Sequence, residues 1–284
     1  MVISVNTNIA SLTAQKSLNN ATNKMNNAME RLSTGYKINS SKDDAAGMAV
    51  SSKLNYKISS LSIAKTNAQM GASMLDTTEG VFGTIQTNLQ RIRDLTEQAA
   101  NGTYGSDSIS AIITEVQARM DEITRVAQST EFNGQYLMNG SIDHNINLQV
   151  GIENNDNSII VLSEDLFKDV SASTILNVTG GKCDDFFKND ETARSFLDNI
   201  DEALKTITTR NTTIGGIQQR ILSSLDSIEV MSTTMTSATS QIQDADIADE
   251  SSNYVRQQIL QQVSTSMLAT ANQAPAIALS LIGG

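Results

Sequence analysis

The fold is decided by residues 196–245, which read FLDNIDEALKTITTRNTTIGGIQQRILSSLDSIEVMSTTMTSATSQIQDA. Apolar residues recur there every three or four positions, and only Arg210 and Ser224 interrupt the series. This spacing places one apolar stripe along an α-helix. Ordinary globular helices rarely exceed about 25 residues, so a stripe of this length is typical of a coiled coil.

A second stretch, residues 50–99, has the same length and a matching apolar pattern. At a rise of 1.5 Å per residue, each stretch would span about 75 Å. We expect these two rods to pack on each other in antiparallel orientation. Shorter helical patterns cover 9–33, 109–127 and 250–272, so about three-fifths of the chain is predicted to be helical, against a base rate of roughly one-third. The second stretch repeats its apolar residues at strict sevens: Leu54, Leu61, Ala68, Leu75, Phe82 and Leu89.

The composition also favours long helices, because aromatic residues make up 4% of the chain and it holds one proline. Residues 131–162 differ from the rods. Asn133-Gly134 is a turn signal, and residues 146–150 and 159–162 follow strand patterns, which predicts a β-hairpin. The predicted fold class is mainly α: a long antiparallel helical rod and a terminal coiled coil, with a small β-hairpin region.

The domain organisation follows from where the apolar register is lost. It does not continue through residues 33–49 or 243–252, which we interpret as connectors. We therefore expect an inner terminal coiled-coil domain (1–44 and 246–284) and a rod domain with the hairpin (45–162 and 193–245). Residues 163–192 show no period and are predicted to form a short, exposed, variable tip. Pro275 is expected to limit the last helix.

The two chain ends are candidates for self-assembly. Helices of 23 to 25 residues are marginal alone, and the ends carry opposite charge: residues 1–60 hold seven Lys/Arg against three acids, and residues 244–284 hold four acids against Arg256. We expect the ends to pair with each other and with neighbouring copies. Such an assembly would bury the apolar surface of the terminal helices that a monomer leaves in solvent. The predicted terminal assembly seam comprises Ala14, Leu18, Ala21, Met25, Ala28, Leu32, Val255, Ile259, Val263 and Met267.

The sequence offers no catalytic, cofactor or metal site. His144 is the single histidine, Cys183 the single cysteine, and Ser62-Ile-Ala-Lys65 lacks the partner motifs of an S-x-x-K enzyme. The acids at 244–250 are explained by the positive end of a helix dipole. A net charge of −11 argues against nucleic-acid binding. With no signal-peptide pattern and no apolar run of membrane length, these rules alone predict a cytosolic protein.

Several long strings resemble bacterial flagellin. They are ERLSTGYKINSSKDDAAG at 30–47, LQRIRDL at 89–95, ANGT at 100–103, FNG at 132–134, QILQQ at 258–262 and ANQAP at 271–275. The resemblance covers roughly residues 1–162 and 194–282. It indicates a short form that lacks the large outer domains of longer relatives.

The resemblance implies a structural subunit of the extracellular flagellar filament, which replaces the cytosolic prediction. Such subunits are exported unfolded, with a chaperone, through the type III export apparatus. They polymerise under a filament cap onto hook-junction proteins and serve motility. The resemblance also implies innate immune recognition by a flagellin-sensing toll-like receptor. The matching receptor or subunit interface positions are Leu89, Arg91, Leu95 and Glu115, although Leu89 also fits a purely internal seam position.

Three alternatives remain, the first within the same structural class and the other two from different classes. A hook–filament junction protein would share the end domains, a secreted helical binding protein would use the rods as a groove, and an enzyme would need a nucleophile, a base and an orienting group. Elongation of filament fragments by the purified chain distinguishes a filament subunit from a binding protein.

Overall fold

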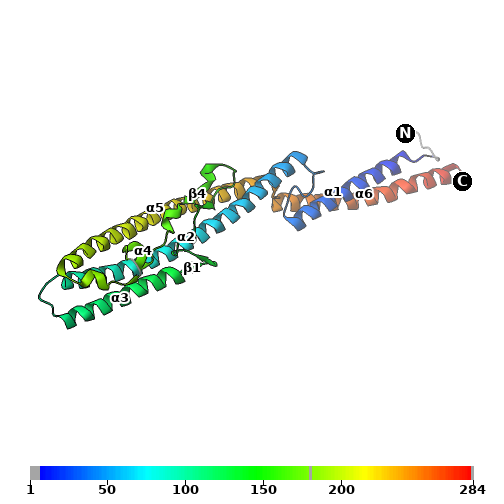
Figure 1. Cartoon of the computed structure of the whole chain (residues 1–284). Helices are drawn as coiled ribbons and strands as arrows, with labels where there is room; N and C mark the ends of the chain where they lie inside the picture. The colour runs from blue at the N-terminus through cyan, green and yellow to red at the C-terminus, as the bar shows by residue number, and fades with distance from the viewer. Residues whose placement is uncertain (1–6, 179–180, 283–284) are drawn as a thin grey trace. The chain divides into compact units, whose positions relative to one another are not determined.

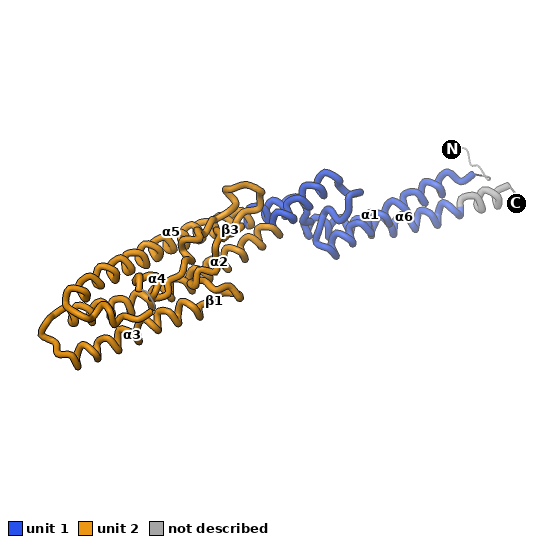
Figure 2. The backbone as a smooth tube through the Cα atoms, in the orientation of Figure 1, with its two compact units in different colours: residues 1–58, 233–284 blue, residues 59–232 orange. Residues whose placement is uncertain are grey.

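The computed structural model describes residues 7–178 and 181–282, with side chains up to Gln273. The chain forms two compact units, one made of residues 1–58 and 233–284 and the other of residues 59–232 (Figure 2). The α-helices and short 3-10 helices together account for 76% of the described residues. The division groups residues 45–58 and 233–245 with the terminal helices, whereas we expected them in the rod domain.

The first unit is built around helices α1 (Ile9–Thr34) and α6 (Ile247–Ile282), which lie side by side (Figure 1). Asn8 caps α1 by accepting a hydrogen bond from the Ser11 amide at 3.0 Å. Gly35 ends α1 with a φ of 76°, a left-handed conformation that glycine adopts without a steric cost. Asp246 caps α6 through the amides of Ala248 and Asp249, so an acid does serve this helix start.

Each expected connector contains a break between helices, but both breaks are shorter than the predicted ranges 33–49 and 243–252. One comprises residues 35–44, before α2 (Ala45–Ala99), and the other residues 244–246, after α5 (Asp190–Gln243). They pair with each other: the Lys37 amide donates to the Gln243 carbonyl at 2.7 Å and the Ala245 amide to the Gly35 carbonyl at 2.9 Å. The α1–α6 pair is therefore closed by a short β-bridge at this end.

The second unit packs α2, α5 and α3 (Ser106–Ser129) along one another (Figure 1). Arg93 on α2 pairs with Asp201 on α5 at 2.8 Å, and Lys65 pairs with Glu229 at 3.1 Å, so the two long helices pack antiparallel as predicted. The predicted sevens are confirmed within this unit. The buried core positions of α2 include Leu61, Ala68, Leu75, Phe82 and Leu89.

The predicted β-hairpin is confirmed. Strand β3 (Ile146–Gln149) pairs antiparallel with β4 (Ile159–Leu162), with Ile146 opposite Leu162, and the single-turn helix η1 (Asp156–Ser158) precedes β4. A smaller pair, β1 (Glu131–Phe132) and β2 (Gln135–Tyr136), turns at Asn133-Gly134. Gly71 on α2 provides space for the hairpin, since a Cβ there would clash with the side chain of Leu148.

The prediction of an exposed tip at residues 163–192 is wrong. This segment forms η2 (Glu164–Leu166), α4 (Ala172–Ile175) and η4 (Asp184–Phe187) and contributes to the core of the second unit. Short turns deliver its apolar side chains at irregular intervals, so no period reveals them. The Phe186 ring, for example, stacks on Phe196 of α5 at 4.5 Å. The buried residues are Leu166, Phe167, Val170, Ala172, Leu176, Val178, Cys183 and Phe187.

The expectation that Pro275 limits the last helix is also wrong, because α6 continues to Ile282. No helix within residues 7–178 and 181–282 is long and apolar enough to span a bilayer.

Candidate functional site: two faces of the terminal helix pair

The α1 half of the predicted seam faces α6 within the same chain. Ala14, Ala21 and Ala28 are buried at intervals of seven. Leu18 and Met25 are half-buried between them, as is Leu32 at the end of the stripe. Because the central positions are alanines, the two helices can approach closely at a contact line that follows the heptad spacing.

The face that α6 presents to α1 is largely polar. Its more buried positions alternate by four and three residues, the spacing of a coiled-coil contact. Glu250 is buried and accepts a hydrogen bond from Arg31 at 2.8 Å, while Gln261 donates to Thr22 at 3.2 Å. The positions concerned are Glu250, Tyr254, Gln257, Gln261, Ser264, Leu268 and Ala271.

Most of the large aliphatic side chains described on α6 point away from α1. Val255 is 50% exposed, Ile259 54%, Val263 47% and Met267 63%. Leu260 is also exposed beside them, and a shallow groove of about 560 Å³ follows this part of the helix. We call Val255, Ile259, Val263 and Met267 the outward stripe. Nothing within the described residues covers it.

The ten seam residues therefore occupy two faces rather than one. The fully buried α1 positions of the inner contact are alanines, whose single methyl groups are worth roughly 0.8 kcal/mol each. Ordering the backbone of one residue costs about 1–2 kcal/mol. The pair alone is consequently marginal, and the outward stripe holds the larger unused apolar surface.

The predicted receptor or subunit positions separate in the same way. Leu89 and Leu95 are buried in the core of the second unit, which fits the internal alternative for Leu89. Arg91 and Glu115 lie at the surface and form a two-bond pair between α2 and α3, with Nε–Oε1 at 2.8 Å and Nη2–Oε2 at 3.2 Å. The hydrogen bond from Arg91 lowers the pKa of Glu115, and Glu115 in turn raises the pKa of Arg91.

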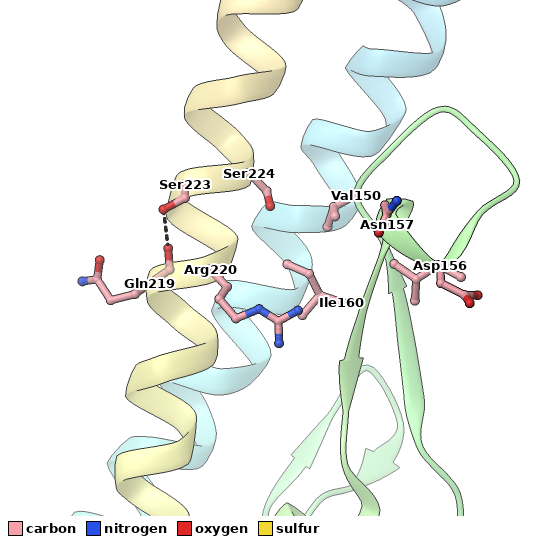
Figure 3. Close-up of a pocket in the computed structure, with 9 residues that line it drawn as sticks. Val150, Asp156, Asn157, Ile160, Gln219, Arg220, Ser223 and Ser224 are labelled. Atoms are coloured by element: carbon pink, nitrogen blue, oxygen red, sulfur yellow. Dashed lines mark hydrogen bonds between the residues drawn. The ribbon is translucent and has the colours of Figure 1, made fainter.

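A second concave surface lies between the hairpin and α5 and was not anticipated from the sequence (Figure 3). It encloses about 460 Å³, and the Arg220 side chain extends from α5 toward Ile160 on the hairpin. Asp156 is the single carboxylate among its lining residues, which include neither histidine nor cysteine. The residues that line this groove therefore include no pair of side chains that could act as general acid and general base.

The remaining reactive groups occupy structural positions. Lys65 of the S-x-x-K string pairs with Glu229, His144 lies in an exposed loop beside Asp143, and Cys183 is a buried free thiol. Burial raises the pKa of the Cys183 thiol to about 11, so it is unreactive at neutral pH. Within the described ranges, no three His, Cys, Asp or Glu side chains gather as metal ligands.

Comparison with known proteins gives matches at both ends of the chain. Residues 5–143 match the bacterial flagellin N-terminal helical region, and residues 197–282 match the bacterial flagellin C-terminal helical region. A putative flagellar hook-associated protein from Vibrio parahaemolyticus shares the fold at 17% identity, with a TM-score of 0.59 over 71% of this chain and 100% of that one.

Full-length relatives are more similar. Flagellin from Halalkalibacterium halodurans is 34% identical over 98% of this chain and 99% of its own length. Flagellin from Xenorhabdus nematophila is 35% identical over 98% of both chains. Matches of this extent, together with the two helical regions, favour a filament subunit over a hook–filament junction protein. The chain belongs to the bacterial flagellin family and is a structural, self-polymerising subunit of the flagellar filament.

Proposed function

We propose that the outward stripe of α6 is the surface through which this subunit packs against neighbouring copies in the filament. The observation that carries the proposal is the orientation of α6: its polar face lies against α1 and its apolar face lies in solvent. Water disfavours an apolar stripe of this size on a marginal helix pair. Contact with a second copy removes it from water and stabilises the pair that presents it.

Seeded elongation tests this proposal. One variant replaces Val255, Ile259, Val263 and Met267 with serine, which leaves the inner face intact. A matched control replaces exposed flanking residues of α6, Asn253, Gln258 and Thr265, with serine. We expect the stripe variant to lose elongation of filament fragments and the control to retain it. Elongation by the stripe variant at the rate of the unsubstituted chain would contradict the proposal.

We further propose that the chain reaches an extracellular filament by unfolded export through the type III apparatus with a chaperone, and is added under the cap onto hook-junction proteins. Family membership supports this route. The free Cys183 is compatible with it, because a chain with one cysteine forms no internal disulfide that would resist unfolding. Secretion of the chain by a strain with and without an intact flagellar export gate tests the route.

Recognition by a flagellin-sensing toll-like receptor is proposed for the exposed pair, Arg91 and Glu115. Leu89 and Leu95 have almost no accessible surface with which to contact a partner. We therefore expect Arg91→Ala to weaken receptor binding without unfolding the rod. We expect Leu89→Ala to act through loss of packing, with a parallel fall in thermal stability. Equal receptor affinity for Arg91→Ala and the unsubstituted chain would remove the pair from the proposed interface.

A further inference from the structure

Helix α6 contains a proline well before its end. It runs from Ile247 to Ile282 and includes Pro275. Proline has no backbone N–H, so the helical hydrogen bond to the carbonyl four residues earlier is missing. That carbonyl belongs to Ala271, a half-buried residue on the face toward α1. A carbonyl that loses its partner in such a place destabilises the helix unless another donor reaches it.

Asn8 supplies that donor from the other helix. Its side-chain Nδ2 donates to the Ala271 carbonyl oxygen at 2.7 Å, in a partly buried contact. The Oδ1 of the same side chain accepts from the Ser11 amide at 3.0 Å and caps α1. One amide group therefore satisfies an unpaired donor at the start of α1 and the unpaired acceptor inside α6.

The chemistry of this double role is specific to an amide. Asparagine, aspartate and serine are similar as N-caps. Only the amide, however, presents an acceptor oxygen and an NH₂ donor on separate atoms of one rigid plane. An aspartate at this position would place an oxygen against the Ala271 carbonyl. A serine hydroxyl is too short to serve both groups.

The free carbonyl also marks one position along α6. Carbonyls in the body of a helix accept from the amide four residues later, whereas the Ala271 carbonyl lacks this donor because residue 275 is proline. Sliding α1 by one helical turn would move the Asn8 amide onto a carbonyl that already has its bond. The other cross-helix contacts, such as Gln261 to Thr22, join two flexible side chains and tolerate a shift more easily.

We infer that Asn8 is a register-setting residue, which supplies to Ala271 the hydrogen bond that Pro275 withholds and so fixes α1 on α6. The outward stripe then keeps one orientation relative to α1. The role of Asn8 itself does not require the proposed assembly function. Only the measurement of filament elongation described below rests on that function.

A double-mutant cycle tests the inference. Asn8→Ser and Asn8→Asp keep the N-cap but remove the side-chain NH₂ that donates to Ala271, while Pro275→Ala restores the backbone N–H of residue 275. In the Pro275 chain, we expect each Asn8 variant to raise the critical concentration for seeded elongation by about five-fold, or ~1 kcal/mol. In the Pro275→Ala chain, the same Asn8→Ser change should cost less than about two-fold, because Ala271 already has a partner.

The control is Ser11→Ala, which removes the adjacent exposed bond from Ser11 Oγ to Asn272 Oδ1 at 2.7 Å. Its effect should be the same with Pro275 and with alanine at that position. Equal costs of Asn8→Ser in the two backgrounds would overturn the inference, even if elongation of the unsubstituted chain supports the proposed function.

A second readout makes the test independent of assembly. Amide hydrogen exchange of peptides from 7–34 and 247–273 is measured for the four chains of the cycle as unassembled protein at low temperature. The inference requires that Asn8→Ser speeds exchange more when Pro275 is present than when alanine replaces it. If the unsubstituted chain fails to elongate seeds, the proposed function fails, and the exchange data still decide the role of Asn8.

Discussion

Replacing Ile259 with alanine should weaken filament growth without weakening the folded rod. Ile259 is 54% exposed in the single chain, so about half of its side-chain area remains available for burial. Full burial of an isoleucine is worth about 1.5–3 kcal/mol, and the available half is therefore worth roughly 1 kcal/mol per subunit. We expect Ile259→Ala to raise the critical concentration by about five-fold.

The assay is seeded growth followed by sedimentation, in which the protein left in the supernatant gives the critical concentration. Gln258→Ala is the matched control, since Gln258 is an exposed neighbour on the flank of the same helix. Alanine favours helix slightly more than either residue, so propensity does not explain a loss. Thermal unfolding of the second unit should be unchanged in both variants, because neither residue belongs to it.

Two outcomes would refute this reasoning. A critical concentration unchanged by Ile259→Ala means that the outward stripe stays in solvent in the filament. An equal rise for Gln258→Ala means that any change to α6 affects growth, so the apolar face has no special part in it.

Three further predictions concern other parts of the chain. Ala21→Leu should separate α1 from α6, because Ala21 is buried in the inner contact; overpacking costs about 1–3 kcal/mol, and faster hydrogen exchange in residues 7–34 of assembled filaments would show it. Burial raises the pKa of the Cys183 thiol from 9.0 to about 11. The contribution of this group to stability is therefore complete below pH 9 and is lost as pH rises toward 11. The difference in the free energy of unfolding between the unsubstituted chain and Cys183→Ser, measured by urea unfolding from pH 8 to 11, should change by about 2–3 kcal/mol. Arg91→Ala should raise the pKa of Glu115 toward its usual value in an NMR titration. Because Arg91 lowers that pKa, the stabilisation from the pair exists above the ordinary glutamate pKa and is lost as pH falls. An unchanged Glu115 titration would contradict the role assigned to Arg91.

The regular parts of the fold were predictable because one physical signal specifies them. A helix expected at 9–33 spans Ile9–Thr34, and the strict sevens of residues 61–89 lie in the core. Each of these positions has a neighbour with the same repeat, so periodicity and packing agree. The β3–β4 hairpin was predictable for the same reason, since alternation and flanking turn residues coincide.

The segment 163–192 shows where this signal ends. Its buried residues are as apolar as those of the rods, but turns of three or four residues deliver them at irregular spacing. Arg210, which interrupts the α5 stripe, donates to the Lys168 carbonyl at 2.9 Å, so the interruption marks the place where the segment covers α5. A charged residue within an apolar stripe could have been interpreted as a sign that a non-helical neighbour packs there.

Helix α6 carries two lines of residues, an apolar one and a polar one, and spacing decides which of them faces α1. Val255, Ile259, Val263 and Met267 are spaced by four, and each step of four advances about 40° around an α-helix. The three steps from Val255 to Met267 therefore turn the stripe by roughly 120° around the helix, which is too far for all four residues to face one straight partner helix. The track from Glu250 to Ala271 alternates by four and three and stays in line with α1, whose alanines recur by seven.

Residue spacing alone predicts that the polar track of α6 faces α1. Hydrophobicity alone would predict that the apolar stripe faces α1. An apolar stripe that turns around its helix suits several neighbours at different angles better than one neighbour along a line. In a helical polymer, copies surround each subunit at several angles, so a stripe with this spacing fits the role that we propose for it in packing against neighbouring copies.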